Sequence, residues 1–133
     1  VASIDIKKDS EGRYNAYTNS GKEKVNRNLF DYIKNVEELG VGELLINNID
    51  RDGMAEGYDL KLLKLIQEIT TLPIIFTGGV GRFDDFVSGI RNNLNAVAAG
   101  NIFHFSENSY YEAMKLLNEK KCNTRPALFG LKL

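Results

Sequence analysis

The chain has 133 residues and a net charge of −1, and 43% of its residues are hydrophobic. This length suits one domain or part of one, and it can bury roughly two-thirds of the unfolded surface. The charge balance favours neither nucleic acid nor an anionic membrane as a partner, and no apolar run approaches the roughly 18 residues of a membrane helix. The single cysteine, Cys122, cannot form an internal disulfide. It fits a reducing compartment, so we expect a cytoplasmic protein.

The predicted elements begin with residues 1–6, an apolar run typical of a buried strand and without the basic start of a secretory signal. A natural domain rarely begins inside a strand and without methionine, so we expect a fragment of a longer protein. Residues 13–18 lie between two turns and predict a hairpin above this strand. Gly40 would end a helix that Asn28 caps and whose apolar stripe is Leu29, Ile33, Val36 and Leu39.

Three more strand–helix pairs follow. Strands are predicted at residues 42–46, 74–77 and 96–99, and the run at 74–77 is typical of a strand covered on both faces. Two helices connect these strands. Asp59 caps the first, which carries Leu62, Leu63, Ile66 and Ile69, and the second buries Phe83, Phe86, Val87 and Ile90. The last helix opens with a capping box, Ser109 and Glu112, and buries Ala113, Met114 and Leu117.

This strict alternation of strands and helices predicts parallel strands joined by right-handed crossovers. Four such units are half of an eight-stranded α/β barrel, so we expect a TIM-type (βα)8 barrel of which this chain supplies a (βα)4 half. We assign residues 1–119 to the half-barrel and residues 120–133, which lose the periodicity, to a C-terminal tail. An open half would expose two unpaired sheet edges, so we expect self-association.

An acidic residue, Asp5, lies near the carboxyl end of the first predicted strand. Asp5 would lie at a barrel mouth, where partial removal of its carboxylate from water suits general acid–base work. The alternative is an ion pair between Asp5 and Lys7 or Lys8.

A second acidic cluster follows the strand at residues 42–46. Asp50, Arg51 and Asp52 cannot all point inward. We expect Asp50 and Arg51 to be structural, with one carboxylate of the loop paired to Arg51. Asp52, beside Gly53, is the acid that we expect to face a ligand.

A glycine-rich turn, Thr77-Gly78-Gly79-Val80-Gly81, follows the third strand. Glycines let backbone N–H groups approach an anion, and the helix that follows adds its positive N-terminal end. Gly100 and Asn101 offer a similar turn at the neighbouring strand end. Because phosphate sites in this fold are often built from the loops after the last two strands, we expect these turns to bind one phosphate together.

His104 is the single histidine. The chain therefore cannot assemble a two-histidine metal site or a Ser-His-Asp triad by itself, and we expect His104 to pack among its aromatic neighbours. No dinucleotide fingerprint or nucleic-acid motif is visible. We expect no metal and no cofactor.

Six motifs occur in order: VASID, TNSG, DRDG-x-x-x-GYD, LPII, GGVG and IFHF, beginning at residues 1, 18, 50, 72, 78 and 102. Over residues 1 to 125 they resemble the carboxyl-terminal half of the cyclase subunit of imidazole glycerol phosphate synthase, the HisF family. The combination is specific because the separations match as well as the motifs.

The resemblance implies a lyase of histidine biosynthesis. A partner glutaminase amidotransferase subunit would release ammonia, which crosses the barrel and reacts with a phosphoribosyl imidazolecarboxamide ribonucleotide to give imidazole glycerol phosphate. The resemblance makes Asp5 a general acid–base residue. It implies that the substrate and one of its phosphates are held by Asn47, Asp52, Thr77, Gly78, Gly79, Gly100 and Asn101. The family's other catalytic aspartate lies in the other half-barrel, so we expect the isolated half to be weakly active or inactive.

Three departures from the family pattern keep alternatives open. Asn47 stands where a small hydroxyl residue is usual, Met54 where threonine is typical, and Gly100-Asn101 where Ala-Ser is more usual. These departures are similar to a HisF-type paralogue that supplies ammonia for amidation of nucleotide-activated or surface sugars. A non-catalytic half-barrel module is the third alternative.

Overall fold

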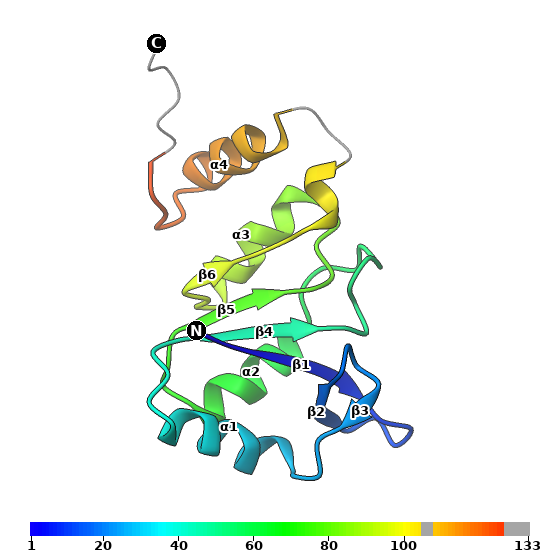
Figure 1. Ribbon diagram of the computed structural model, residues 1–133. Helices are drawn as coiled ribbons and strands as arrows, with labels where there is room; N and C mark the ends of the chain where they lie inside the picture. Colours follow the sequence, from blue (N-terminus) through cyan, green and yellow to red (C-terminus); the bar gives the residue numbers. More distant parts are fainter. Residues whose placement is uncertain (105–107, 127–133) are drawn as a thin grey trace.

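The computed structural model describes residues 1–104 and 108–126. Within these residues one mixed sheet has the strand order β3-β2-β1-β4-β5-β6 (Figure 1). The strands are β1 (Ala2–Lys8), β2 (Tyr14–Thr18), β3 (Glu23–Lys24), β4 (Leu44–Asn48), β5 (Ile74–Thr77) and β6 (Ala96–Val97). The helices are α1 (Leu29–Glu38), α2 (Leu60–Ile69), α3 (Phe83–Arg91) and α4 (Ser109–Glu119), with a short 3-10 helix η1 (Asn101–His104). Phe105 and residues 106–107 and 127–133, which include the second half of the expected tail, lie outside the described part.

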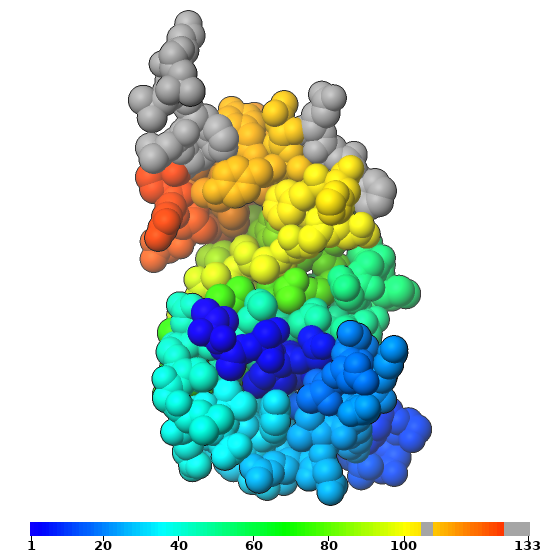
Figure 2. Space-filling model, in the orientation of Figure 1, coloured from blue at the N-terminus to red at the C-terminus, as the bar shows by residue number. Residues whose placement is uncertain are grey.

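The strands β1, β4, β5 and β6 are parallel neighbours and alternate with helices along the chain. This confirms the predicted (βα)4 half of a TIM-type barrel. In Figure 1, α2 and α3 lie behind the sheet and α1 lies below it, and residues of β1 reach the surface on the opposite face in Figure 2. This opposite face, which the helices leave uncovered, is the one that would line the interior of a closed barrel.

The core lies between the sheet and the helices. Alternate strand residues are completely buried there, among them Ile6, Ile46 and Phe76, whereas their neighbours along each strand are only half-buried. The expectation that residues 74–77 are covered on both faces is therefore wrong for this chain. The reason is that Ile75 and Thr77 alternate with the buried Ile74 and Phe76, so they face away from the helices and are only half-buried.

Two predicted caps fix the starts of α1 and α2. The Asn28 side chain accepts a hydrogen bond from the Asp31 N–H at 2.8 Å, and the Asp59 carboxylate accepts from the N–H groups of Lys61 and Leu62, both at 3.1 Å. Each satisfies donors that the first helical turn leaves without a partner. Both caps confirm the sequence analysis.

Other details of the helices differ from the expectations. Leu39 follows the last residue of α1 and is 77% exposed, so it does not belong to the buried stripe. The chain turns away at this point because Gly40 adopts φ +83°.

The expected capping box of α4 is also wrong. Asn108, with φ 57°, precedes the helix and makes no side-chain cap, and Ser109 is already its first helical residue.

The strand expected at residues 96–99 ends at Val97. The Ala98 N–H still donates to the Phe76 carbonyl at 3.0 Å, after which the chain turns into η1. In the described residues no strand pairs with the outer side of β6, so nothing extends it.

The two sheet edges differ from each other. β6 is an open edge, as expected, but β2 pairs with Asp5–Lys8 of β1 and leaves only the first half of β1 free.

The helices of the described part are too short and too polar for any of them to cross a membrane.

Candidate active site at the carboxyl ends of the strands

A row of polar side chains crosses three neighbouring strands. Asp5 of β1 is in register with Asn47 of β4, and Asn47 is in register with Thr77 of β5. All three are half-buried, and they lie on the face that no helix covers. Because neighbouring strands lie about 4.8 Å apart, the row spans about 10 Å from Asp5 to Thr77. The glycine turn begins at the next residue, so the row and the turn share one rim of the sheet.

Asp5 is held by a neutral partner. The Asn47 side-chain amide donates to its Oδ1 at 2.9 Å. The Lys7 ammonium instead donates to the Gly21 carbonyl at 2.8 Å and lies 4.5 Å from the centre of the Tyr17 ring. The expected alternative for Asp5, an ion pair with Lys7 or Lys8, is absent from the described residues.

The acidic loop after β4 is fixed differently from the expectation. Asp50 is structural as expected: its carboxylate accepts from the Lys8 N–H at 2.7 Å. Arg51 does not pair with either neighbouring acid. Its guanidinium donates to the carbonyls of residues 56–58, and its nearest carboxylate is that of Asp59, at 3.9 Å.

The Gly57-Tyr58-Asp59 motif joins three parts of the rim. The Gly57 N–H donates to the Gly79 carbonyl at 2.8 Å, and the Tyr58 hydroxyl donates to the Ala98 carbonyl at 3.0 Å. Burial, together with the nearby charge of Asp85, raises the pKa of Tyr58 well above its ordinary value, so the hydroxyl stays a donor at neutral pH. This bond fixes the loop after β4 against the end of β6.

Asp59 is the centre of a buried polar network. Besides capping α2, its carboxylate accepts from the Tyr14 hydroxyl at 2.7 Å and from the Asn48 amide at 3.3 Å. Burial by itself would raise the pKa of Asp59, but the hydrogen bonds and the charge of Arg51 outweigh it and hold this pKa below its ordinary value. Asp59 therefore stays charged and serves the architecture of the rim.

Asp52 and the glycine turn line one shallow hollow. Its walls are residues of the three loops after β4, β5 and β6, namely Asp52, Gly53, Gly78, Gly79, Val80, Ala99, Gly100 and Asn101. The hollow thus brings three of the expected glycines, Gly78, Gly79 and Gly100, together with Asp52 and Asn101, whereas Thr77 and Gly81 of the expected turn do not line it. Asp52 itself is exposed.

Gly78 and Gly79 are needed for this geometry. Their φ angles are +96° and +102°, a region that side chains disfavour. A Cβ atom on Gly78 would lie 2.4 Å from the Asn48 carbonyl oxygen, and one on Gly79 would lie 2.3 Å from the Gly57 carbonyl oxygen. The loops after β4 and β5 therefore pack directly backbone against backbone.

The start of α3 does not supply free N–H groups for an anion, contrary to the expectation. The Asp85 carboxylate accepts from the N–H groups of Gly81 and Arg82, both at 2.9 Å. These two donors are thus already satisfied within the protein. The sequence analysis missed Asp85, although an acidic residue in the first turn of a helix is a recognised capping signal. The N–H groups of Gly79, Gly100 and Asn101 donate to no protein acceptor in residues 1–104 and 108–126.

His104 differs from its expected role as a packing residue. It lies at the end of η1 and is exposed, whereas Phe103 stacks on Phe86 with ring centres 6.0 Å apart. The aromatic contact of this segment is therefore made by Phe103.

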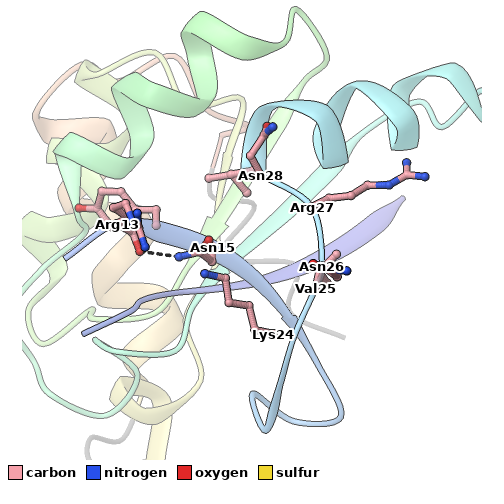
Figure 3. Close-up of a pocket in the computed structure, with 9 residues that line it drawn as sticks. Arg13, Asn15, Lys24, Val25, Asn26, Arg27 and Asn28 are labelled. Carbon is pink, nitrogen blue, oxygen red and sulfur yellow. Dashed lines mark hydrogen bonds between the residues drawn. The ribbon is translucent and has the colours of Figure 1, made fainter. Parts of the chain in front are cut away.

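A second hollow, of about 420 Å³, lies between the β2–β3 hairpin and the start of α1 (Figure 3). Its cations are largely committed: Arg13 and Lys24 approach the Asp9 carboxylate at 3.2 and 3.4 Å, and Figure 3 shows Arg27 pointing away from them. The Arg13 N–H and its neighbours hold the pKa of Asp9 well below its ordinary value. Two of the three cations that line this hollow, Arg13 and Lys24, are thus paired with an acid.

Together these features define a TIM-type βα protein with a polar rim at the carboxyl ends of its strands, where such folds carry their sites. Among the described residues no group of three or more potential metal ligands occurs. The chain belongs to the family described as "Histidine biosynthesis protein", whose model matches residues 1–109.

Curated relatives agree with this assignment. The chain is 35% identical over 126 residues to the imidazole glycerol phosphate synthase subunit HisF of Alkaliphilus metalliredigens, covering 94% of this chain and 50% of that protein. The HisF subunits of Thermotoga sp. (strain RQ2) and Chlorobaculum tepidum are 36% and 37% identical, over 94% of this chain and 49% and 50% of their own lengths. These similarities confirm the resemblance to HisF. The chain spans about half the length of the curated relatives that it matches.

Proposed function

We propose that the complete polypeptide carrying this sequence is a cyclase that uses ammonia on a phosphoribosyl imidazolecarboxamide ribonucleotide to form imidazole glycerol phosphate. One observation carries the proposal: the row of polar side chains that includes Asp5 shares one rim with the glycine-lined hollow, because Thr77 of the row directly precedes Gly78. In this proposal Asp5 transfers protons, and the hollow holds a phosphate about 10 Å away. The similarity to HisF subunits supports this choice of reaction.

Within the hollow the two kinds of residue have different tasks. The N–H groups of Gly79, Gly100 and Asn101 are suited to phosphate oxygens because they have no protein acceptor among the described residues. A carboxylate would repel a phosphate, so we infer that Asp52 accepts from a substrate hydroxyl beside it. Asn47 and Thr77 lie between this hollow and Asp5, where they would contact the reacting part of the substrate.

A second function is amidation of a nucleotide-activated or surface sugar with the same ammonia supply. Asn47 supports this alternative, because its amide bonds to Asp5 where a small hydroxyl is usual in the HisF family. Under either function we infer a glutaminase subunit as the partner that supplies ammonia. We also infer that the open edge of β6 pairs with a second half-barrel. If the chain sediments only as a monomer, this inference is contradicted.

The test is turnover by the complete polypeptide with the ribonucleotide and an ammonium salt. We expect imidazole glycerol phosphate to form without any glutaminase, because added ammonia replaces the partner. Binding of the ribonucleotide without product would contradict the cyclase and leave the sugar-amidating function. Failure to bind any phosphorylated ligand would contradict both.

A further inference from the structure

We propose that Asn47 is a positioning residue that sets the orientation of the Asp5 carboxylate. This inference rests on the proposed role of Asp5 in proton transfer. It assigns Asn47 a task beyond contact with substrate, and it makes residue 47 a determinant of which chemical group the site accepts.

The chemistry of the two side chains fixes how they meet. An ionised carboxylate can only accept hydrogen bonds, so the Asn47 amide must present its NH₂ group to Asp5. The amide is planar, and its carbonyl oxygen therefore points away from the Asp5 carboxylate. Asn47 thus places an acceptor beside Asp5 while it holds Asp5 in place.

The surrounding residues leave this bond as the main restraint on Asp5. The Lys7 ammonium is engaged by the Gly21 carbonyl, and the Lys8 ammonium lies over the Tyr14 ring at 4.9 Å. In the described part of the chain, Asn47 is the one side chain that donates to Asp5. The second oxygen of Asp5 and the carbonyl of Asn47 are then both available on the uncovered face.

Two adjacent acceptors favour a ligand group that carries more than one hydrogen. Ammonia, a primary amine and a carboxamide meet this requirement, whereas an ester or ether oxygen does not. A hydroxyl side chain at position 47 could still donate to Asp5, but its acceptor would be the same oxygen and not a separate carbonyl that points away from Asp5. The structure therefore assigns the nitrogen-bearing part of the substrates to the Asp5–Asn47 end of the row.

The experiment compares variants of the complete polypeptide in ammonia-dependent turnover. Asn47→Leu should lower kcat by about 10- to 100-fold, because a displaced acid–base group is costly, and leave KM for the phosphorylated substrate nearly unchanged. Asn47→Thr, which keeps a donor, should recover most of kcat. In an Asp5→Asn background, Asn47→Leu should cause little further loss. Ser3→Ala, one step back on the same strand face, is the control.

The outcomes separate this inference from the proposed function. If Asp5→Asn abolishes turnover and Asn47→Leu leaves kcat unchanged, only the positioning role is wrong. If Asn47→Leu costs as much in the Asp5→Asn background as alone, the two residues act independently and the inference is overturned. A measurement without turnover uses the chain itself: the NH₂ resonances of Asn47 should shift on Asp5→Asn and stay fixed on Ser3→Ala. Unchanged NH₂ resonances on Asp5→Asn would also overturn the inference.

Discussion

Replacing Asp5 by asparagine should lower ammonia-dependent turnover of the complete polypeptide by about 100-fold or more, because positioned proton transfer contributes that much to many enzymes. The substitution keeps the size of the side chain and removes its ability to exchange a proton. Asp5 is half-buried and has no ionic partner among the described residues, so the loss should appear in kcat and leave the folded structure intact. Steady-state kinetics with an ammonium salt measures kcat, and a thermal unfolding curve shows whether the folded structure is intact.

A second aspartate on the same rim provides the matched control. Asp50 accepts a backbone hydrogen bond from Lys8, which an asparagine oxygen can also accept. Asp50→Asn should therefore retain turnover within a few-fold of the unchanged protein. Equal activities of the two variants would show that Asp5 is not the acid–base group.

Gly79→Ala should cause the largest loss of stability of any single methyl addition at the rim, roughly 3 kcal/mol or more in the free energy of unfolding. The added carbon would lie 2.3 Å from the Gly57 carbonyl oxygen, and φ +102° disfavours any side chain. The neighbouring backbone bond from Gly57 to Gly79 prevents the two loops from moving apart at low cost. Urea denaturation of the chain provides the measurement.

Gly100→Ala is the matched control for this variant. A Cβ atom at Gly100 would meet no atom within 4 Å, and its φ lies outside the range that favours glycine. Its free energy of unfolding should change by less than about 0.5 kcal/mol. If both variants unfold at the same urea concentration, the close backbone packing at Gly79 does not contribute to stability.

Much of this fold could be predicted because its signals are local. Asn28 and Asp59 sit immediately before apolar stripes, and each forms the cap that its residue type favours. The apolar runs of β1, β4 and β5 fix the parallel order, since alternating helices allow few other arrangements. The position of Asp5 and of the glycine turn on one rim follows from that order.

The errors arise where the path of the backbone, and not the type of a residue, decides which partner that residue contacts. Arg51 lies between two acids in sequence, yet it binds carbonyls of residues 56–58, because the loop folds back on itself. The bond from Tyr58 to Ala98 spans 40 residues and has no local signal. Ser109 has the residue pattern of a cap, but the chain enters α4 through Asn108 in a left-handed conformation.

The site itself was predicted at the level of residue types and not of their partners. Spacing placed the two glycine turns together, the resemblance added Asp52, and the hollow contains residues of all three. Spacing could not indicate that Asp85 would occupy the donors at the start of α3, or that Asn47 would bond to Asp5. Both depend on side-chain geometry that only the folded chain defines.

The central claim is that the glycine turns and the polar row that includes Asp5 form one phosphate-accepting site. A titration of the chain with inorganic phosphate, followed by amide NMR, tests this claim most directly. We predict that the largest shifts occur at Gly78, Gly79, Gly100 and Asn101, the residues that line the hollow at the rim. The hollow between the β2–β3 hairpin and α1 offers the competing site, and the amides of residues 24–28 that line it should move little because Asp9 already pairs with Arg13 and Lys24. Shifts concentrated in residues 24–28, or no shift at the glycines, would contradict the account.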